Sequence, residues 1–389
     1  MKTLGLVLLL FAGAAAQVPW DTAAPLPFPR YSASTVSAGD IGYVLGGSVT
    51  GAVKTATMLV YHQQGDSWSV GDSMLVARHR FGACGTAEKL YVFGGWGSGG
   101  VLLNRGESYD VGSRTWAPIE TMKVKRASLA GAMVNGKLYA LGGWTGTVSL
   151  AAVEEYDPAT GHWTTKRPMT AARCEMMVGV WNNLIYLIGG TTNGSDVLNK
   201  VEAYDPVRDT WYVRAPIPTP RTAAGCGAVG GKICVFGGVT TGGVNTRATE
   251  VYWPATNQWL ATESLPSSRR FIAGFGLYYD RVYAIGGADS IMQAMTLVEY
   301  LDLPMGLSAE PGASIEPAAR TFFRRGELVR SPFGEQRFSA RVYDCAGVLQ
   351  GKLMGTGALL CPPLASGVYL VSWQAGAAET VTRLMVLAD

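Results

Sequence analysis

Apolar residues occur along this chain in short runs of about five or six positions, separated by glycine, asparagine and aspartate. Such runs, rich in Val, Tyr, Leu and Phe, are typical of β-strands joined by tight turns and lack the period of an amphipathic helix. One stretch shows the order in full: Asn135-Gly136, the apolar run 138–141, Gly142-Gly143, Tyr156 and Trp163. We interpret it as four short antiparallel strands, named a to d, with a two-residue hairpin between a and b.

The same unit recurs six times. A glycine doublet follows strand b in every copy, at steps of 47 to 49 residues: Gly46-Gly47, Gly94-Gly95, Gly142-Gly143, Gly189-Gly190, Gly237-Gly238 and Gly286-Gly287. A tryptophan in strand d keeps the same step: Trp20, Trp68, Trp116, Trp163, Trp211 and Trp259. Such a period is the signature of a repeat architecture, because one small sheet buries too little apolar surface to be stable alone.

The two markers are out of phase at the ends of the array. Trp20 precedes the first doublet, whereas the position expected for a tryptophan after the last doublet holds Ser308. One repeat is therefore divided between the two ends. An N-terminal strand that carries Trp20 can complete the last sheet and remove an exposed sheet edge, so the pattern predicts a closed ring.

A tyrosine in strand c, seven residues before the strand d tryptophan, completes the unit at Tyr61, Tyr109, Tyr156, Tyr204 and Tyr252. This set of glycine doublet, tyrosine and tryptophan resembles the Kelch repeat and covers residues 17–303. The resemblance implies an all-β fold, a six-bladed Kelch β-propeller closed by an N-terminal strand. Some six-bladed secreted Kelch proteins are sugar mutarotases, so the resemblance also leaves an enzymatic alternative open.

Both ends of the chain carry further signals. Residues 1–16 combine Lys2, an apolar stretch and three small residues, which predicts a secretory signal peptide and export by a Sec-type route. No later apolar run reaches the length of a transmembrane helix. Three prolines among small residues make 304–320 a linker, and the alternating segments of 321–389 predict a small β-sandwich.

The last seventy or so residues resemble the C-terminal sorting domain of the type IX secretion system. The resemblance rests on the segments 342–347, 364–370 and 382–386. Arg383 stands where that family has lysine, and Ser331-Pro332-Phe333 replaces its Asn-Pro-Phe. The resemblance implies a secreted or cell-surface protein that contacts the secretion machinery through this domain.

Charge and cysteine content narrow the possible partners. The net charge of +3 is too small to indicate a nucleic-acid partner, and we expect a monomer. Cys345 and Cys361 are the only cysteines in the C-terminal unit. A disulfide between them could add about 3 kcal/mol, and two unpaired buried thiols are the alternative.

An arginine follows each strand d tryptophan by ten residues, at Arg30, Arg78, Arg126, Arg173, Arg221 and Arg269. Propeller geometry places these residues on the face that carries the d-to-a connections and the b-to-c loops. There they could attract carboxylates of a ligand. A residue present in every repeat more often holds the scaffold, by bonding loop carbonyls or pairing with acids such as Glu107, Glu154, Glu202, Glu250 and Glu299.

Positions that differ between repeats are better candidates for a binding site. Trp96 and Trp144 follow their doublets directly, at the start of adjacent b-to-c loops, where the other copies have smaller residues. With Arg78, Arg105, Arg126 and Arg173, these indoles could contact a protein or a glycan. The alternative is that they wedge between blades.

Catalysis has little support in the sequence. Only His62, His79 and His162 are present, on both faces, so we expect no metal and no cofactor. For the mutarotase alternative, Glu175 or Asp289 could act as the acid or base. We therefore expect an exported, non-enzymatic Kelch propeller that binds a protein or glycan at or outside the cell surface, with a metal-independent carbohydrate isomerase or mutarotase as the alternative.

Overall fold

The computed structural model describes residues 19–38, 40–277 and 281–303 with their side chains, and the backbone of seven strands between 321 and 388. The chain forms two compact units, residues 1–306 and 307–389. The predicted signal peptide, the 304–320 linker and the Cys345–Cys361 pair lie outside the described residues.

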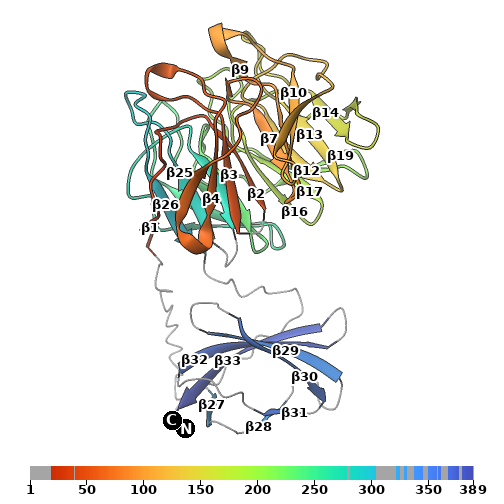
Figure 1. The fold of residues 1–389 in the computed structure, drawn as a ribbon, viewed down its shortest axis with the longest axis vertical. Coiled ribbons are helices and arrows are strands. Elements are labelled where there is room, and N and C mark those ends of the chain that lie inside the picture. The colour runs from red at the N-terminus through yellow and green to blue at the C-terminus, as the bar shows by residue number, and fades with distance from the viewer. Residues whose placement is uncertain are drawn as a thin grey trace, which may run out of the picture. The chain divides into compact units, whose positions relative to one another are not determined.

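Six four-stranded antiparallel sheets make up the first unit (Figure 1), each ordered a-b-c-d from one edge to the other. Blade 1 contains β2 (Ser34–Ala38), β3 (Ile41–Leu45), β4 (Met58–His62) and β5 (Ser67–Val70). Blade 2 contains β7 (Gly82–Gly85), β8 (Lys89–Phe93), β10 (Gly106–Asp110) and β11 (Thr115–Ile119). Blade 3 contains β12 (Ala130–Val134), β13 (Lys137–Leu141), β14 (Val153–Asp157) and β15 (His162–Lys166).

The remaining three sheets complete the array. Blade 4 contains β16 (Met177–Trp181), β17 (Leu184–Ile188), β18 (Val201–Asp205) and β19 (Thr210–Arg214). Blade 5 contains β20 (Gly225–Val229), β21 (Lys232–Phe236), β22 (Thr249–Trp253) and β23 (Gln258–Thr262). Blade 6 contains β24 (Ala273–Leu277), β25 (Arg281–Ile285), β26 (Val298–Asp302) and β1 (Asp21–Thr22). Short additions are β6 (Arg78–His79), β9 (Trp96–Gly97) and the 3-10 turns η1 (Thr50–Ala52), η2 (Gln63–Gly65) and η3 (Ser98–Gly100).

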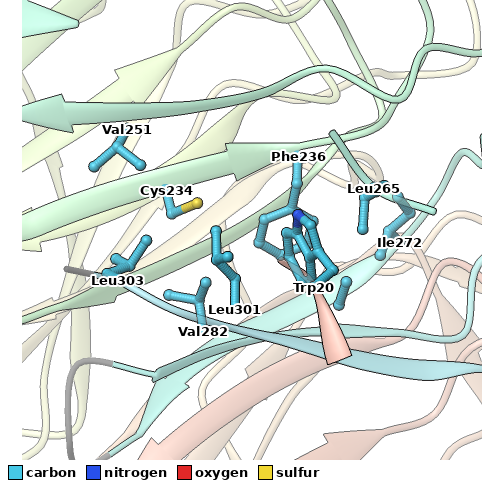
Figure 2. Close-up of a cluster of buried hydrophobic side chains, with 10 residues drawn as sticks. Trp20, Cys234, Phe236, Val251, Leu265, Ile272, Val282, Leu301 and Leu303 are labelled. Atoms are coloured by element: carbon cyan, nitrogen blue, oxygen red, sulfur yellow. The ribbon is translucent and has the colours of Figure 1, made fainter. Parts of the chain in front are cut away.

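The N-terminal strand closes the ring, as the phase of the repeats predicts. β1 pairs with β26 in the register Asp21↔Tyr300, so the last blade is completed by the first residues of the array. Trp20 is buried in a cluster with residues of blades 5 and 6, where its ring meets Phe236 edge to face at 5.4 Å (Figure 2). The six-bladed propeller is therefore confirmed.

The inner strands β2, β7, β12, β16, β20 and β24 neighbour one another in a closed cycle. They approach so closely that side chains are excluded at several points. A Cβ atom added to Gly131 on β12 would lie 2.6 Å from the backbone nitrogen of Ala83 on β7. Glycine on the inner strands thus permits the tight packing of blades around the axis.

A cycle of six backbone hydrogen bonds surrounds the axis on the face of the d-to-a connections. It is formed by the residue two positions after each repeated arginine: Ser32, Arg80, Ser128, Glu175, Ala223 and Phe271. Each donates its N–H to the carbonyl of the preceding member, at 2.6 to 3.3 Å, and Ser32 closes the cycle on Phe271. All six have left-handed backbone conformations, with φ between 52° and 54°. We call them the mouth ring.

The second unit is also all-β. A five-stranded sheet contains, in spatial order, β27 (Thr321–Arg324), β33 (Glu379–Ala388), β32 (Gly367–Ala375), β29 (Arg337–Asp344) and β30 (Leu349–Thr356). A two-stranded sheet contains β28 (Leu328–Arg330) and β31 (Ala358–Leu360). β27 runs parallel to β33, and the other pairs are antiparallel.

Candidate functional site

The six repeated arginines lie inside the blades and not on the surface. Arg78, Arg126 and Arg173 have no exposed surface, and the other three are at most 2% exposed. Arg78 shows the pattern: Nη1 donates to the carbonyls of Gly94 and Arg105, both at 2.9 Å, and Nη2 donates to a carboxylate. The ion pairs are Arg78–Glu107, Arg126–Glu154, Arg173–Glu202, Arg221–Glu250 and Arg269–Glu299.

The sequence-based hypothesis that Arg78, Arg126 and Arg173 contact a ligand is therefore corrected. Their guanidinium groups are enclosed by the blade and donate hydrogen bonds to carbonyls and carboxylates of that blade. Burial nevertheless lowers the pKa of Arg126 to about 10, because it disfavours the charged form more than Glu154 favours it. The repetition of these residues reflects their role in tying each d-to-a connection to strand c and the b-to-c loop.

Blade 1 departs from this pattern. Arg30 donates to the carbonyls of Gly46 and Thr57 at 2.8 and 2.9 Å, but Leu59 occupies the strand position that glutamate holds in the other blades. Among the described residues, no carboxylate pairs with Arg30. Burial alone lowers the pKa of Arg30 to about 10.

Trp96 and Trp144 lie on adjacent blades, and both are partly exposed. Trp96 belongs to β9, which pairs with β6 in the register His79↔Trp96, and Trp144 forms isolated bridges with Ala127 and Ser149. A Cβ atom on Gly146, in the blade 3 loop, would lie 3.7 Å from Cη2 of Trp96. One edge of the Trp96 indole therefore leans on the neighbouring loop, while part of the ring meets solvent. Arg105 is exposed in the same blade 2 loop.

A second group of side chains that differ between the repeats lies in the mouth ring. Arg80 extends across the ring, with Nη1 2.7 Å from Oε1 of Glu175 and its guanidinium carbon 4.3 Å from the centre of the Phe271 ring. Thr222 adds a hydrogen bond from Oγ1 to Oε2 of Glu175 at 3.3 Å. This ion pair lies at one end of an axial cavity of about 440 Å³, lined mainly by residues of the inner strands.

Sequence reasoning identified Glu175 but missed Arg80, which lies 95 residues before it, and Phe271, which lies 96 residues after it, each on another blade. The available signal was the position two residues after each repeated arginine, which differs in most copies. Of the two carboxylates considered as acid or base, Glu175 is engaged by Arg80. Oδ1 of Asp289 accepts hydrogen bonds from the N–H groups of Ile291 and Gln293, and so caps its own loop.

The three histidines do not form a common site. The ring of His62 hydrogen-bonds Ser69 in strand d of blade 1, and the ring of His162 hydrogen-bonds Glu120 at the end of strand d of blade 2. By contrast, Nδ1 of His79 lies 2.8 Å from Oγ of Ser48. Among the described residues, no three histidine, cysteine, aspartate or glutamate side chains are grouped so that they could hold a metal ion. Within the same residues, no helix is long and apolar enough to cross a bilayer.

His79 makes the stability of the folded protein depend on pH. Burial, together with the charges of Arg80 and Lys54, lowers the pKa of His79 to about 4. Between pH 6.5 and 4 the unfolded chain binds a proton that the folded chain does not, so stability falls as the pH falls through this window. We expect His79→Gln to reduce the loss between pH 7 and 4.5 by about 1 to 2 kcal/mol, measured by urea unfolding at both pH values. Equal losses in the two proteins would contradict this.

Comparison with known proteins agrees with the repeat pattern. Residues 32–215 match the family model described as the KLHDC2/KLHL20/DRC7 Kelch-repeats domain. No curated protein matches the chain. The chain contains a Kelch-repeat domain, and its first unit is a six-bladed Kelch β-propeller. Kelch propellers generally mediate protein interactions, which makes a protein-binding scaffold the general class to which this fold points.

Proposed function

We propose that this chain is an exported protein whose propeller binds a partner protein through the face of the b-to-c loops, centred on Trp96 and Trp144. One observation carries the proposal: two partly exposed indoles, absent from the equivalent positions of the other blades, lie on adjacent loops. Large aromatic side chains at the centre of an interface often supply much of its binding energy. A glycan that stacks on the same indoles is the alternative ligand.

The backbone that carries each indole is held in place before any partner binds. Trp96 belongs to the β6–β9 pairing, and the backbone N–H of Trp144 donates to the carbonyl of Ala127 at 2.7 Å. A loop whose backbone is already ordered loses little conformational entropy on binding. This favours a binding role over loose packing between blades.

Export is the second part of the proposal. It rests on the signal-peptide pattern of residues 1–16 and on the resemblance of the last seventy or so residues to a type IX sorting domain, which would place the protein outside the cell or at its surface. We further propose that the protein is not an enzyme. The two carboxylates nearest to a catalytic role are both engaged, Glu175 by Arg80 and Asp289 by its own loop. A mutarotase remains the alternative.

We expect the double variant Trp96→Ala plus Trp144→Ala to remain folded and to lose binding at least tenfold. The full chain is tested against arrays of purified extracellular proteins and of glycans, and affinities for any hit are measured by surface plasmon resonance. Trp181→Ala is the matched control, because Trp181 is also partly exposed but ends β16 beside the a-to-b turn, on the opposite face.

The array separates the possible outcomes. A protein hit that is lost in the double variant and kept in Trp181→Ala supports the proposal. A glycan hit with the same behaviour replaces the protein partner by a sugar. Unfolding of the double variant, seen by circular dichroism, would show that the indoles serve packing. A protein hit that both variants bind equally well would refute the location of the site.

A further inference from the structure

An exposed aliphatic side chain lies at or next to the tip of the b-to-c loop in five of the six blades. These residues are 55% to 78% exposed: Val53, Val101, Val148, Val244 and Ile291. All b-to-c loops emerge on one face of the propeller, so the five side chains surround its axis. We call them the loop-tip crown. Isolated surface valines are ordinary, but here an aliphatic residue recurs at the same place in five loops of one face.

The crown is rigid. The carbonyl of Val101 accepts a hydrogen bond from the N–H of Gly97 at 2.8 Å, and that of Val244 accepts one from Thr240 at 2.9 Å. Ile291 is fixed by its N–H bond to the Asp289 carboxylate at 3.0 Å. Valine and isoleucine also have few side-chain rotamers. Covering these side chains therefore costs little conformational entropy, and each buried methylene contributes favourably to binding.

Blade 4 interrupts the crown. Its loop carries Asn193 and Asp196 instead, joined by a hydrogen bond of 2.7 Å from Nδ2 to the carboxylate. A flat lipid surface would have to bury this carboxylate with the valines, at a large desolvation cost. A folded protein can instead leave a recess or place a donor at this point. A short extended peptide could not reach five blades at once.

The charges around the crown are mainly positive. The six b-to-c loops contain four cations, Lys54, Arg105, Lys200 and Arg247, and two carboxylates, Asp196 and Asp289. Both carboxylates already accept hydrogen bonds within their own loops, and Lys200 pairs with the carboxylate of Glu202, which leaves Lys54, Arg105 and Arg247 to set the charge of this face. A partner with acidic side chains at its border would therefore be favoured over a basic one.

From these features we infer that the loop-tip crown is the contact surface for a folded partner protein that presents an apolar patch bordered by acidic side chains. This inference rests on the proposed binding function of the same face and specifies the partner's chemistry. Trp96 and Trp144 form the centre of one side of the interface, and the crown extends the contact over the other blades.

The test uses the full chain and a phage-displayed library of a folded three-helix scaffold with one randomised face. We expect the selected scaffolds to carry apolar residues flanked by Asp and Glu. Their affinity should fall at least tenfold for Val101→Ser plus Val244→Ser, which changes blades 2 and 5. The matched control is Val207→Ser plus Val213→Ser, two exposed valines of blade 4 outside the b-to-c loops. Surface substitutions of this kind rarely alter stability by more than about 0.5 kcal/mol.

Each remaining outcome has a definite meaning. Scaffolds that lose affinity only for the double tryptophan variant would overturn the crown inference and leave the proposed function intact. Scaffolds that lose affinity for neither variant would overturn both. Selection of Lys- and Arg-flanked scaffolds would overturn the charge assignment. Co-sedimentation with phosphatidylcholine–phosphatidylserine vesicles, lost in the crown variant, would replace the protein partner with a lipid surface.

Discussion

Deletion of residues 19–24 is expected to produce the largest loss of stability and to promote aggregation. The deletion removes Trp20, whose loss alone corresponds to about 3 to 5 kcal/mol for a buried tryptophan. It also removes β1 and leaves β26 as an unpaired edge strand, able to pair with another chain. Urea unfolding would measure the stability change, and size-exclusion chromatography with light scattering would measure the association.

Trp163→Ala is the control for this deletion. Trp163 is 5% exposed and occupies the equivalent position in blade 3, but its replacement leaves every strand in place. We therefore expect it to cost about 3 to 5 kcal/mol through a cavity without promoting association. A deletion variant that stays monomeric and unfolds like Trp163→Ala would show that β1 is not needed for closure.

Glu202→Ala is expected to cost about 3 to 5 kcal/mol, because it leaves the guanidinium of Arg173 buried without its counter-charge. Both side chains are fully buried and lie 2.7 Å apart. Thr170 and Lys200 also bond this carboxylate, so several polar groups lose their partner at once. The loss would be measured by urea unfolding at pH 7.

Two further variants interpret that result. Arg173→Met plus Glu202→Leu should be less destabilised than Glu202→Ala, because replacement of a whole buried pair leaves no isolated charge. Arg114→Ala breaks the exposed pair with Asp72 and should change stability far less. If Glu202→Ala and Arg114→Ala reduced the free energy of unfolding by similar amounts, the buried ion pairs would not hold the blades together as proposed.

The fold could be predicted from the sequence because its markers are local and repeated. The doublets mark the end of strand b, where the close approach of the next blade excludes a side chain on the first glycine: a Cβ on Gly94 would lie 2.7 Å from the carbonyl oxygen of Arg126. The tyrosine of strand c packs on the tryptophan of strand d, as in Tyr109 and Trp116, whose ring centres are 5.0 Å apart. Each marker thus reports a contact within its own blade or with the next.

The candidate sites were less predictable because their contacts join distant residues. The sequence near Arg78 left open whether its guanidinium points to solvent or inward, because the carbonyls of Gly94 and Arg105 and the carboxylate of Glu107 surround it only in the folded blade. Similarly, Arg80 meets Glu175 and Phe271 only when blades 2, 4 and 6 surround one axis. The loop-tip valines were overlooked because single apolar residues in glycine-rich loops resemble ordinary surface positions.

In the mouth ring, the backbone conformation is constant while the side chains vary. Its six members have the same backbone torsion and the same hydrogen bonds, although their side chains are hydroxyl, cationic, acidic, methyl and aromatic. The hydrogen bonds of the ring join backbone groups only, so the side chain at each position can be substituted while the ring is kept. The restriction is conformational: β-branched residues are poorly tolerated at positive φ, and none is present. New binding properties could therefore arise at the mouth ring through single substitutions, without a change in the structure of the blades.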